Sequence, residues 1–174
     1  IWPNNARLAL QIVLNYEEGG ESCVLNGDKY SETFLSEIIG AKAIKGRHMS
    51  MESIYEYGSK AGFWRLDKLF REKKIPVTIF GVGLALKKNP EICEAIKKGN
   101  YEVAAHGYRW INYQNIKKSV EKKHMQHAIK SIMDIFGSRP LGWYTGRCSP
   151  NTRDLVFDEG NFLYDSDSYS DDLP

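Results

Sequence analysis

The chain has 174 residues, with 24 lysines and arginines against 22 aspartates and glutamates, and 42% of its residues are hydrophobic. This length predicts one domain, and the aromatic and aliphatic content excludes an intrinsically disordered chain. The net charge of +2 is too small to indicate a nucleic-acid-binding protein. No apolar run approaches the roughly 18–20 residues needed to span a bilayer, so no membrane partner is expected.

The cysteines are Cys23, Cys93 and Cys148, and no C-x-x-C spacing occurs among them. Such a sparse, odd set predicts reduced thiols and argues against a zinc knuckle or a redox motif. No export-signal pattern opens the sequence. We therefore expect a cytoplasmic protein.

The first half of the chain predicts two strands around a long loop and a helix. Residues 6–14 alternate apolar and polar and then run apolar, as a buried strand does. Residues 15–50 predict a long loop with a helical turn near 36–39, and loops of this length are usually functional. Ser59 is expected to cap a helix that runs to about Lys73, followed by a β-branched strand over 75–82.

The second half repeats the alternation of strands and helices. Asn89-Pro90 predicts a helix start and Gly99 a helix end, and the longest helix is expected over 115–136. The remaining predicted elements are strands at 101–105, 141–144 and 161–165 and a short helix at 151–159. This order predicts an α/β fold with a parallel sheet and helices outside it. A closed barrel of eight units usually needs about 200 residues or more, so the five strands form either an open sheet or part of a larger barrel.

Polar side chains follow the predicted strands. Because the carboxyl ends of parallel strands meet at one edge of a sheet, we expect these side chains to converge there. In particular, we expect Glu17, Glu18 and His106 to line one cavity with Arg147. The residues are Glu17, Glu18, His106, Trp110, Tyr144, Arg147 and Asp165.

Each of these candidates has a plain structural interpretation beside the chemical one. Glu17 and Glu18 form either a solvated acidic turn or an acid–base site, in which only one of two adjacent side chains faces the reacting atom. His106 is either a satisfied core histidine or a catalytic one. His124 and His127 have a spacing that can bind metal, but no acid or cysteine partner lies on that turn, so we interpret them as structural.

The order of motifs resembles the polysaccharide deacetylase family. The matching features are a strand followed by an acid pair and glycine, a later His-Gly-aromatic string, and the strings at 139–143 and 160–166. The resemblance implies a distorted (β/α) barrel. Members of that family usually carry a T-F-D-D-G motif, which supplies a base and a metal ligand, and an H-x-x-x-H motif with two metal-binding histidines.

This chain departs from the family pattern at those motifs. N-Y-E-E-G-G stands in place of T-F-D-D-G, so Glu17 matches the base and Glu18 the metal ligand. His106 matches the first histidine, but Trp110 occupies the second position and cannot ligate a metal. One histidine and one glutamate are too few ligands to hold zinc firmly, so we expect no metal cofactor; zinc or another divalent metal is the alternative.

Five strings resemble the metal-independent allantoinase branch of the family. They lie at 15–21, 50–66, 106–113, 139–153 and 164–174. This resemblance implies hydrolysis of a small cyclic ureide, (S)-allantoin to allantoate, in purine catabolism. It also implies that residues 1–174 are part of a single catalytic domain whose barrel extends beyond both ends; a homo-oligomer is left open.

Ring opening of a cyclic ureide needs a base that activates water, an acid for the leaving nitrogen and donors for the oxyanion. The resemblance implies that Glu17 and His106 supply the first two roles in an order that stays open, with Glu18 beside them. Arg147 and backbone N–H groups would serve the oxyanion, and Trp110 would wall the pocket. Tyr144 and Asp165 complete the expected substrate-binding set. The competing hypotheses are a metal-dependent deacetylase of N-acetylated sugars in carbohydrate metabolism and an inactive truncated relative.

Overall fold

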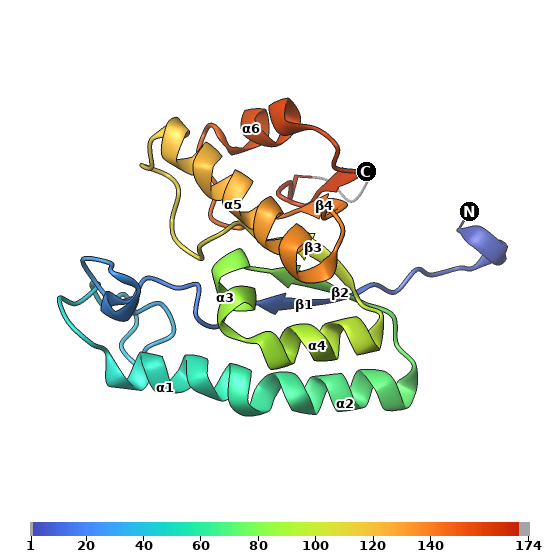
Figure 1. The fold of residues 1–174 in the computed structure, drawn as a ribbon, viewed down its shortest axis with the longest axis horizontal. Helices are drawn as coiled ribbons and strands as arrows, with labels where there is room; N and C mark the ends of the chain where they lie inside the picture. The colour runs from blue at the N-terminus through green and yellow to red at the C-terminus, as the bar shows by residue number, and fades with distance from the viewer. Residues whose placement is uncertain (1, 171–174) are drawn as a thin grey trace.

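The computed structural model describes residues 2–170, and its centre is a five-stranded parallel sheet (Figure 1). The strands are β1 (Ile12–Tyr16), β2 (Val77–Gly81), β3 (Glu102–Ala105), β4 (Gly142–Trp143) and β5 (Tyr164–Asp165). Their order in the sheet is the order of the chain, so each strand pairs with the next one. The sheet is open, with β1 and β5 at its edges among the described residues. This architecture confirms the predicted parallel α/β fold.

Helices connect the strands. They are α1 (Met49–Tyr57), α2 (Phe63–Lys73), α3 (Gly83–Lys88), α4 (Pro90–Gly99), α5 (Lys118–Phe136) and α6 (Thr152–Glu159), with short turns η1 (Pro3–Asn5), η2 (Val24–Asn26) and η3 (Gly58–Gly62). The turn η3 is a π-helical turn that joins α1 to α2, so the two helices run end to end along one side of the molecule (Figure 1). α5 packs against α3 and β3, and α4 packs against α2. In the part of the chain that the structure describes, none of these helices is long and apolar enough to cross a membrane.

The core forms where these helices pack on the middle of the sheet. Every residue of β2 is buried, which agrees with its β-branched and aromatic composition and its place between two strands. Large apolar side chains that are almost fully buried contribute about 1.5–3 kcal/mol each to folding. Examples are Ile79, Leu86, Ile96, Met125 and Ile132.

Four local predictions are wrong, and the first is the helical turn near 36–39, where the backbone forms bends and turns without a helix. β1 begins at Ile12 and not at residue 6, because the preceding alternation has no partner to bury it: Leu8 and Leu10 are 77% and 78% exposed. Ser59 does not cap a helix, since it lies inside η3 and the helical run begins at Met49. The structure also adds α3 directly after β2, where no helix was predicted.

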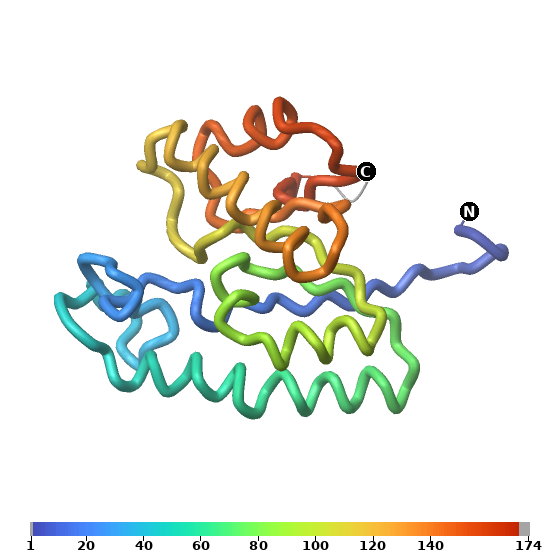
Figure 2. The backbone as a smooth tube through the Cα atoms, viewed as in Figure 1, coloured from blue at the N-terminus to red at the C-terminus, as the bar shows by residue number. Residues whose placement is uncertain are grey.

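The long loop between β1 and α1 lies at the carboxyl ends of the strands (Figure 2). It is not structureless. Ser31 pairs with Ile44 in an antiparallel bridge, and its Oγ donates a 2.6 Å hydrogen bond to the Gly46 carbonyl. Thr33 Oγ1 donates to the Ala41 carbonyl at 2.7 Å. These contacts close residues 31–46 into a compact segment beside the end of the sheet that carries the candidate residues.

Candidate active site

Glu17 and His106 meet at the carboxyl ends of β1 and β3. The His106 Nε2 atom lies 2.9 Å from Glu17 Oε1, and the histidine is only 2% exposed. Asn15 Nδ2 donates to the same glutamate oxygen at 3.2 Å. The sheet fixes this geometry, because the backbone N–H of His106 bonds the Gly81 carbonyl and that of Val82 bonds the Tyr16 carbonyl. The result is a hydrogen-bonded pair of a carboxyl group and an imidazole at the ends of β1 and β3.

Aromatic rings surround the imidazole. The ring centroid of Tyr144 lies 4.7 Å from that of His106, and the Phe80 ring lies 6.5 Å away at a steep angle. The second ring nitrogen, Nδ1, is buried without a hydrogen-bond partner among the described residues. A buried nitrogen of this kind costs free energy unless a polar molecule satisfies it.

Glu18 faces the other way, contrary to the expectation that it shares a cavity with His106 and Arg147. Its Oε2 accepts the Glu17 backbone N–H at 3.1 Å, and its carboxylate packs so closely on Gly58 that a Cβ atom there would overlap it. Burial raises the pKa of the Glu18 carboxyl, and the nearby charge of Glu17 adds to this effect, although backbone N–H groups partly oppose it.

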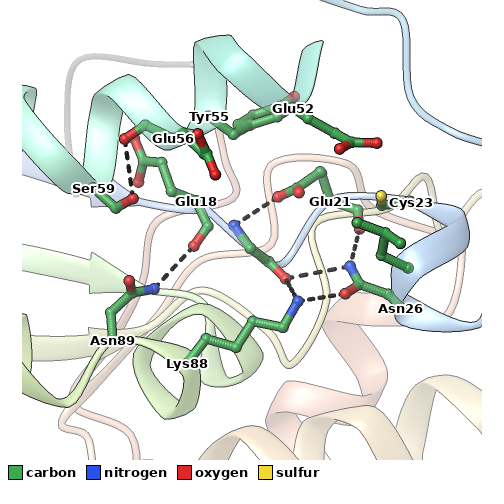
Figure 3. Close-up of a pocket in the computed structure, with 12 residues that line it drawn as sticks. Glu18, Glu21, Cys23, Asn26, Glu52, Tyr55, Glu56, Ser59, Lys88 and Asn89 are labelled. Atoms are coloured by element: carbon green, nitrogen blue, oxygen red, sulfur yellow. Dashed lines mark hydrogen bonds between the residues drawn. The ribbon is translucent and has the colours of Figure 1, made fainter. Parts of the chain in front are cut away.

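Glu18 instead lines a separate cavity of about 270 Å³ between the turn after β1, the α1–η3 segment and the α3–α4 corner (Figure 3). Lys88 Nζ spans part of its rim, donating to the Gly19 carbonyl at 3.1 Å and to the Asn26 side chain. Asn89 Nδ2 donates to the Glu18 carbonyl at 3.3 Å. Neither Glu17 nor His106 is among the residues that line this cavity.

The side chains of Trp110 and Arg147 stack on each other near the turn that follows β1. The Trp110 backbone N–H bonds the Gly20 carbonyl at 2.9 Å, and its neighbour along the bridge is Glu21. The Arg147 guanidinium lies 3.8 Å from the Trp110 ring centroid, and its Nη1 lies 2.9 Å from Glu32 Oε2. Trp110 is thus a buried side chain beside this turn, and the Arg147 guanidinium is already paired with the Glu32 carboxylate.

Asp165 and Tyr144 lie at the ends of the last strands. Burial and the neighbouring Asp167 raise the pKa of the Asp165 carboxyl. Asp167 accepts the backbone N–H groups of Thr145 and Gly146 at 2.8–2.9 Å, which shapes the loop that presents Tyr144.

Sequence reasoning missed two residues that organise this edge, Glu32 and Asp167. Asp167 carried the usable signal, since it follows a strand with Asp165. Glu32 carried no such signal, because it lies within the long loop and is 115 residues away from its partner Arg147 in the sequence.

The residues present do not fit the metal site of the deacetylase pattern. Trp110 occupies the second histidine position, Glu18 turns away from His106, and no group of three or more histidine, cysteine, aspartate or glutamate side chains suited to a metal occurs within residues 2–170. On α5, the His124 Nδ1 lies 2.9 Å from the Tyr113 hydroxyl, and burial lowers the pKa of this histidine. These contacts favour the structural interpretation of His124.

Comparison with known proteins gives one consistent family. The sequence matches the polysaccharide deacetylase family over residues 45–156. A putative polysaccharide deacetylase of Schizosaccharomyces pombe is 41% identical over 99% of this chain and 57% of its own length.

Two crystal structures superpose closely on this one. A probable polysaccharide deacetylase from Pseudomonas aeruginosa PAO1 has a TM-score of 0.95 and 57% identity over 99% of this chain and 58% of its own. The PuuE allantoinase has a TM-score of 0.95 and 55% identity over 99% of this chain and 57% of its own. The chain therefore has the fold of these proteins and spans somewhat more than half their length.

Proposed function

Because the chain belongs to the polysaccharide deacetylase family, we propose that it is part of a hydrolase that cleaves carbon–nitrogen bonds other than peptide bonds. We further propose that residues 1–174 are part of a single catalytic domain and that the substrate is a cyclic ureide, allantoin, opened to allantoate without a metal. The 55% identity with an allantoinase over nearly the whole chain supports this choice of substrate.

The observation that carries the proposal is the 2.9 Å contact between Glu17 and His106. In a metal-free ring opening, one member of the pair takes a proton from water while the water oxygen bonds to the ring carbonyl carbon. The ring C–N bond then breaks, and the other member returns a proton to the leaving nitrogen. A carboxyl group and an imidazole are both side chains that serve as general acids or bases, so both roles are available within one pair.

The oxyanion that forms during this attack needs hydrogen-bond donors. Arg147 is a poor candidate, because its Nη1 is held 2.9 Å from Glu32 and its plane is covered by Trp110. We assign this role to backbone N–H groups of the glycine-containing turns at the strand ends. Tyr144, whose ring lies against His106 at a tilt, and Asp165, whose carboxyl pKa is raised, are proposed to contact the substrate.

The competing function is a metal-dependent N-deacetylase of polysaccharides. The family match favours it, but it would need Glu18 and His106 to share an ion, and the structure places the Glu18 carboxylate in a different cavity. The metal-free proposal requires no such rearrangement.

The test is allantoate formation by the protein as it is naturally produced, measured before and after treatment with a chelator, together with its metal content. We expect turnover of allantoin that the chelator does not change, well under one metal ion per chain, and no release of acetate from N-acetylglucosamine oligomers. Stoichiometric zinc with chelator-sensitive acetate release would replace this proposal with the deacetylase.

A further inference from the structure

Arg147 lies against two aromatic rings that come from distant parts of the chain and contact each other edge to face, with ring centroids 5.9 Å apart. Its guanidinium carbon is 3.8 Å from the Trp110 ring centroid and 4.9 Å from that of Phe34. Trp110 belongs to the loop after β3, and Phe34 to the segment 31–46. A planar guanidinium suits such an aromatic corner, because it stacks on an aromatic face while its edge still donates hydrogen bonds.

The Glu32 carboxylate accepts a hydrogen bond from the edge of the Arg147 guanidinium, and backbone N–H groups hold this carboxylate in place. Its Oε2 lies 2.9 Å from Arg147 Nη1, and its Oε1 accepts the backbone N–H groups of Thr33 and Phe34 at 2.8 and 2.9 Å. Burial alone would raise the pKa of Glu32, but these hydrogen bonds outweigh it and lower the pKa. The two side chains are only 21% and 18% exposed, so solvent screens this ion pair less than an ordinary surface pair.

The segment 31–46 contacts the rest of the molecule here and also at the preceding loop, where the Glu32 backbone N–H donates to the Ser22 carbonyl at 2.8 Å. It closes on itself through the Ser31–Ile44 bridge, and the ion pair joins it to the loop after β4. Together with Asn112 and Gly146, the segment and Arg147 line an open cavity of about 840 Å³. One wall of that cavity therefore depends on the ion pair.

We propose that Glu32 and Arg147 form a latch that fastens segment 31–46 to the sheet and seats Trp110 against the turn that follows Glu17. In this arrangement Arg147 is a positioning residue that supports substrate binding without touching the reacting atoms. Only the effect on substrate binding rests on the proposed function; the fastening of the segment does not.

Limited proteolysis tests the fastening directly. Lys42 and Lys45 place trypsin sites inside the segment. Cleavage by a protease tracks the fraction of time that a segment is open, so Arg147→Gln and Glu32→Gln should each speed cleavage there by about tenfold. The double variant should add little to either single change, because both remove the same contact.

The chain offers a matched control at the other end of the sheet. Arg139 Nη2 lies 3.0 Å from Glu159, and its guanidinium lies 5.2 Å from the Phe162 ring centroid. Arg139→Gln removes a similar ion pair and stack far along the chain from segment 31–46. It should leave cleavage at Lys42 and Lys45 unchanged, which separates release of the latch from general destabilisation.

Kinetics with allantoin test the positioning role. Arg147→Gln should raise KM by about tenfold while kcat falls by less than about threefold, and Arg147→Lys should lie between this variant and wild type. Unchanged cleavage in Glu32→Gln would overturn the latch, even if Arg147→Gln failed to fold. A large fall in kcat at constant KM would make Arg147 a transition-state donor instead. Absence of allantoin turnover in the wild type would end the proposed function but leave the proteolysis result standing.

Discussion

Glu17 and Glu18 are neighbours in the chain, yet their side chains leave the end of β1 in different directions. One contacts His106, and the other is buried beside Gly58. Substitution of each should therefore change a different property of the protein, and the two can be measured separately.

Glu17→Gln should slow catalysis. The amide keeps the shape of the carboxyl group but cannot take a proton, so we expect kcat for allantoin to fall by about 10²–10⁴-fold with little change in KM. Steady-state kinetics measure this. Glu72→Gln, at an exposed position paired only loosely with Lys68, is the control and should match wild type. A Glu17→Gln enzyme with most of its rate would place the base elsewhere.

Glu18→Gln should change how stability depends on pH. Since the pKa of Glu18 is raised in the folded protein, its proton stabilises the fold below the ordinary pKa of a glutamate, and this contribution is lost as the pH rises through the raised pKa. The variant cannot ionise. It should match wild type in urea unfolding near about pH 4 and exceed it near about pH 8. Equal stability at both pH values would contradict a buried, weakly acidic Glu18.

Much of the candidate site is readable from which residues follow strands. That rule brings Glu17 and His106 to one edge because parallel strands end together, and the structure joins them. It cannot tell where Glu18 points, since a side chain just beyond a strand no longer follows the alternation of the pleat. It also cannot find the partner of Arg147, because Glu32 is separated from it by most of the chain.

At the scale of elements, the joint between α1 and α2 depends on a small residue. Gly58 has ordinary helical dihedral angles, so Gly58→Ala would normally stabilise a helix by about 1 kcal/mol. Here the new Cβ would overlap the Glu18 carboxyl group, and we expect a loss of about 1–3 kcal/mol in urea unfolding.

Gly62, four residues later in the same turn, provides the comparison. A Cβ there would meet its nearest atom at 3.7 Å, which is an ordinary contact, so Gly62→Ala should be neutral or stabilising. Combining Gly58→Ala with Glu18→Ala should recover part of the loss. Similar effects of both glycine substitutions would show that the carboxylate does not restrict the joint.

The elements with strong patterns were predictable, and the weak ones were not. β2 and α5 have continuous β-branched or periodic apolar residues and lie close to their predicted positions. α3 is only six residues long and begins with glycine, so it carries too little periodicity to be recognised. Residues 6–11 carry a strand pattern but remain unpaired. An alternating pattern indicates that a segment can form a strand, but it does not show that a neighbouring strand is present to pair with it.

At the scale of the whole molecule, the sheet formed by residues 2–170 has two unpaired edges, those of β1 and β5, with apolar side chains nearby. Leu10 precedes β1 and Leu163 precedes β5, and both are exposed. A protein made only of residues 1–174 should therefore self-associate with rising concentration, as size-exclusion chromatography with light scattering would show. Leu163→Lys should weaken this association, whereas Leu25→Lys, at an exposed position in η2, should not. A monomer at every concentration would contradict the role of the edges.

The order β1-β2-β3-β4-β5 also has a consequence for how the chain is made. Every strand pairs with the strand synthesised just before it, so each new strand and its preceding helix find a finished docking surface as they leave the ribosome. Each pairing closes a crossover connection, and the longest of these separates Ile12 of β1 from its partner Val77 of β2 by 65 residues. The fold can thus grow in one direction, from β1 to β5, without reopening the pairs already formed.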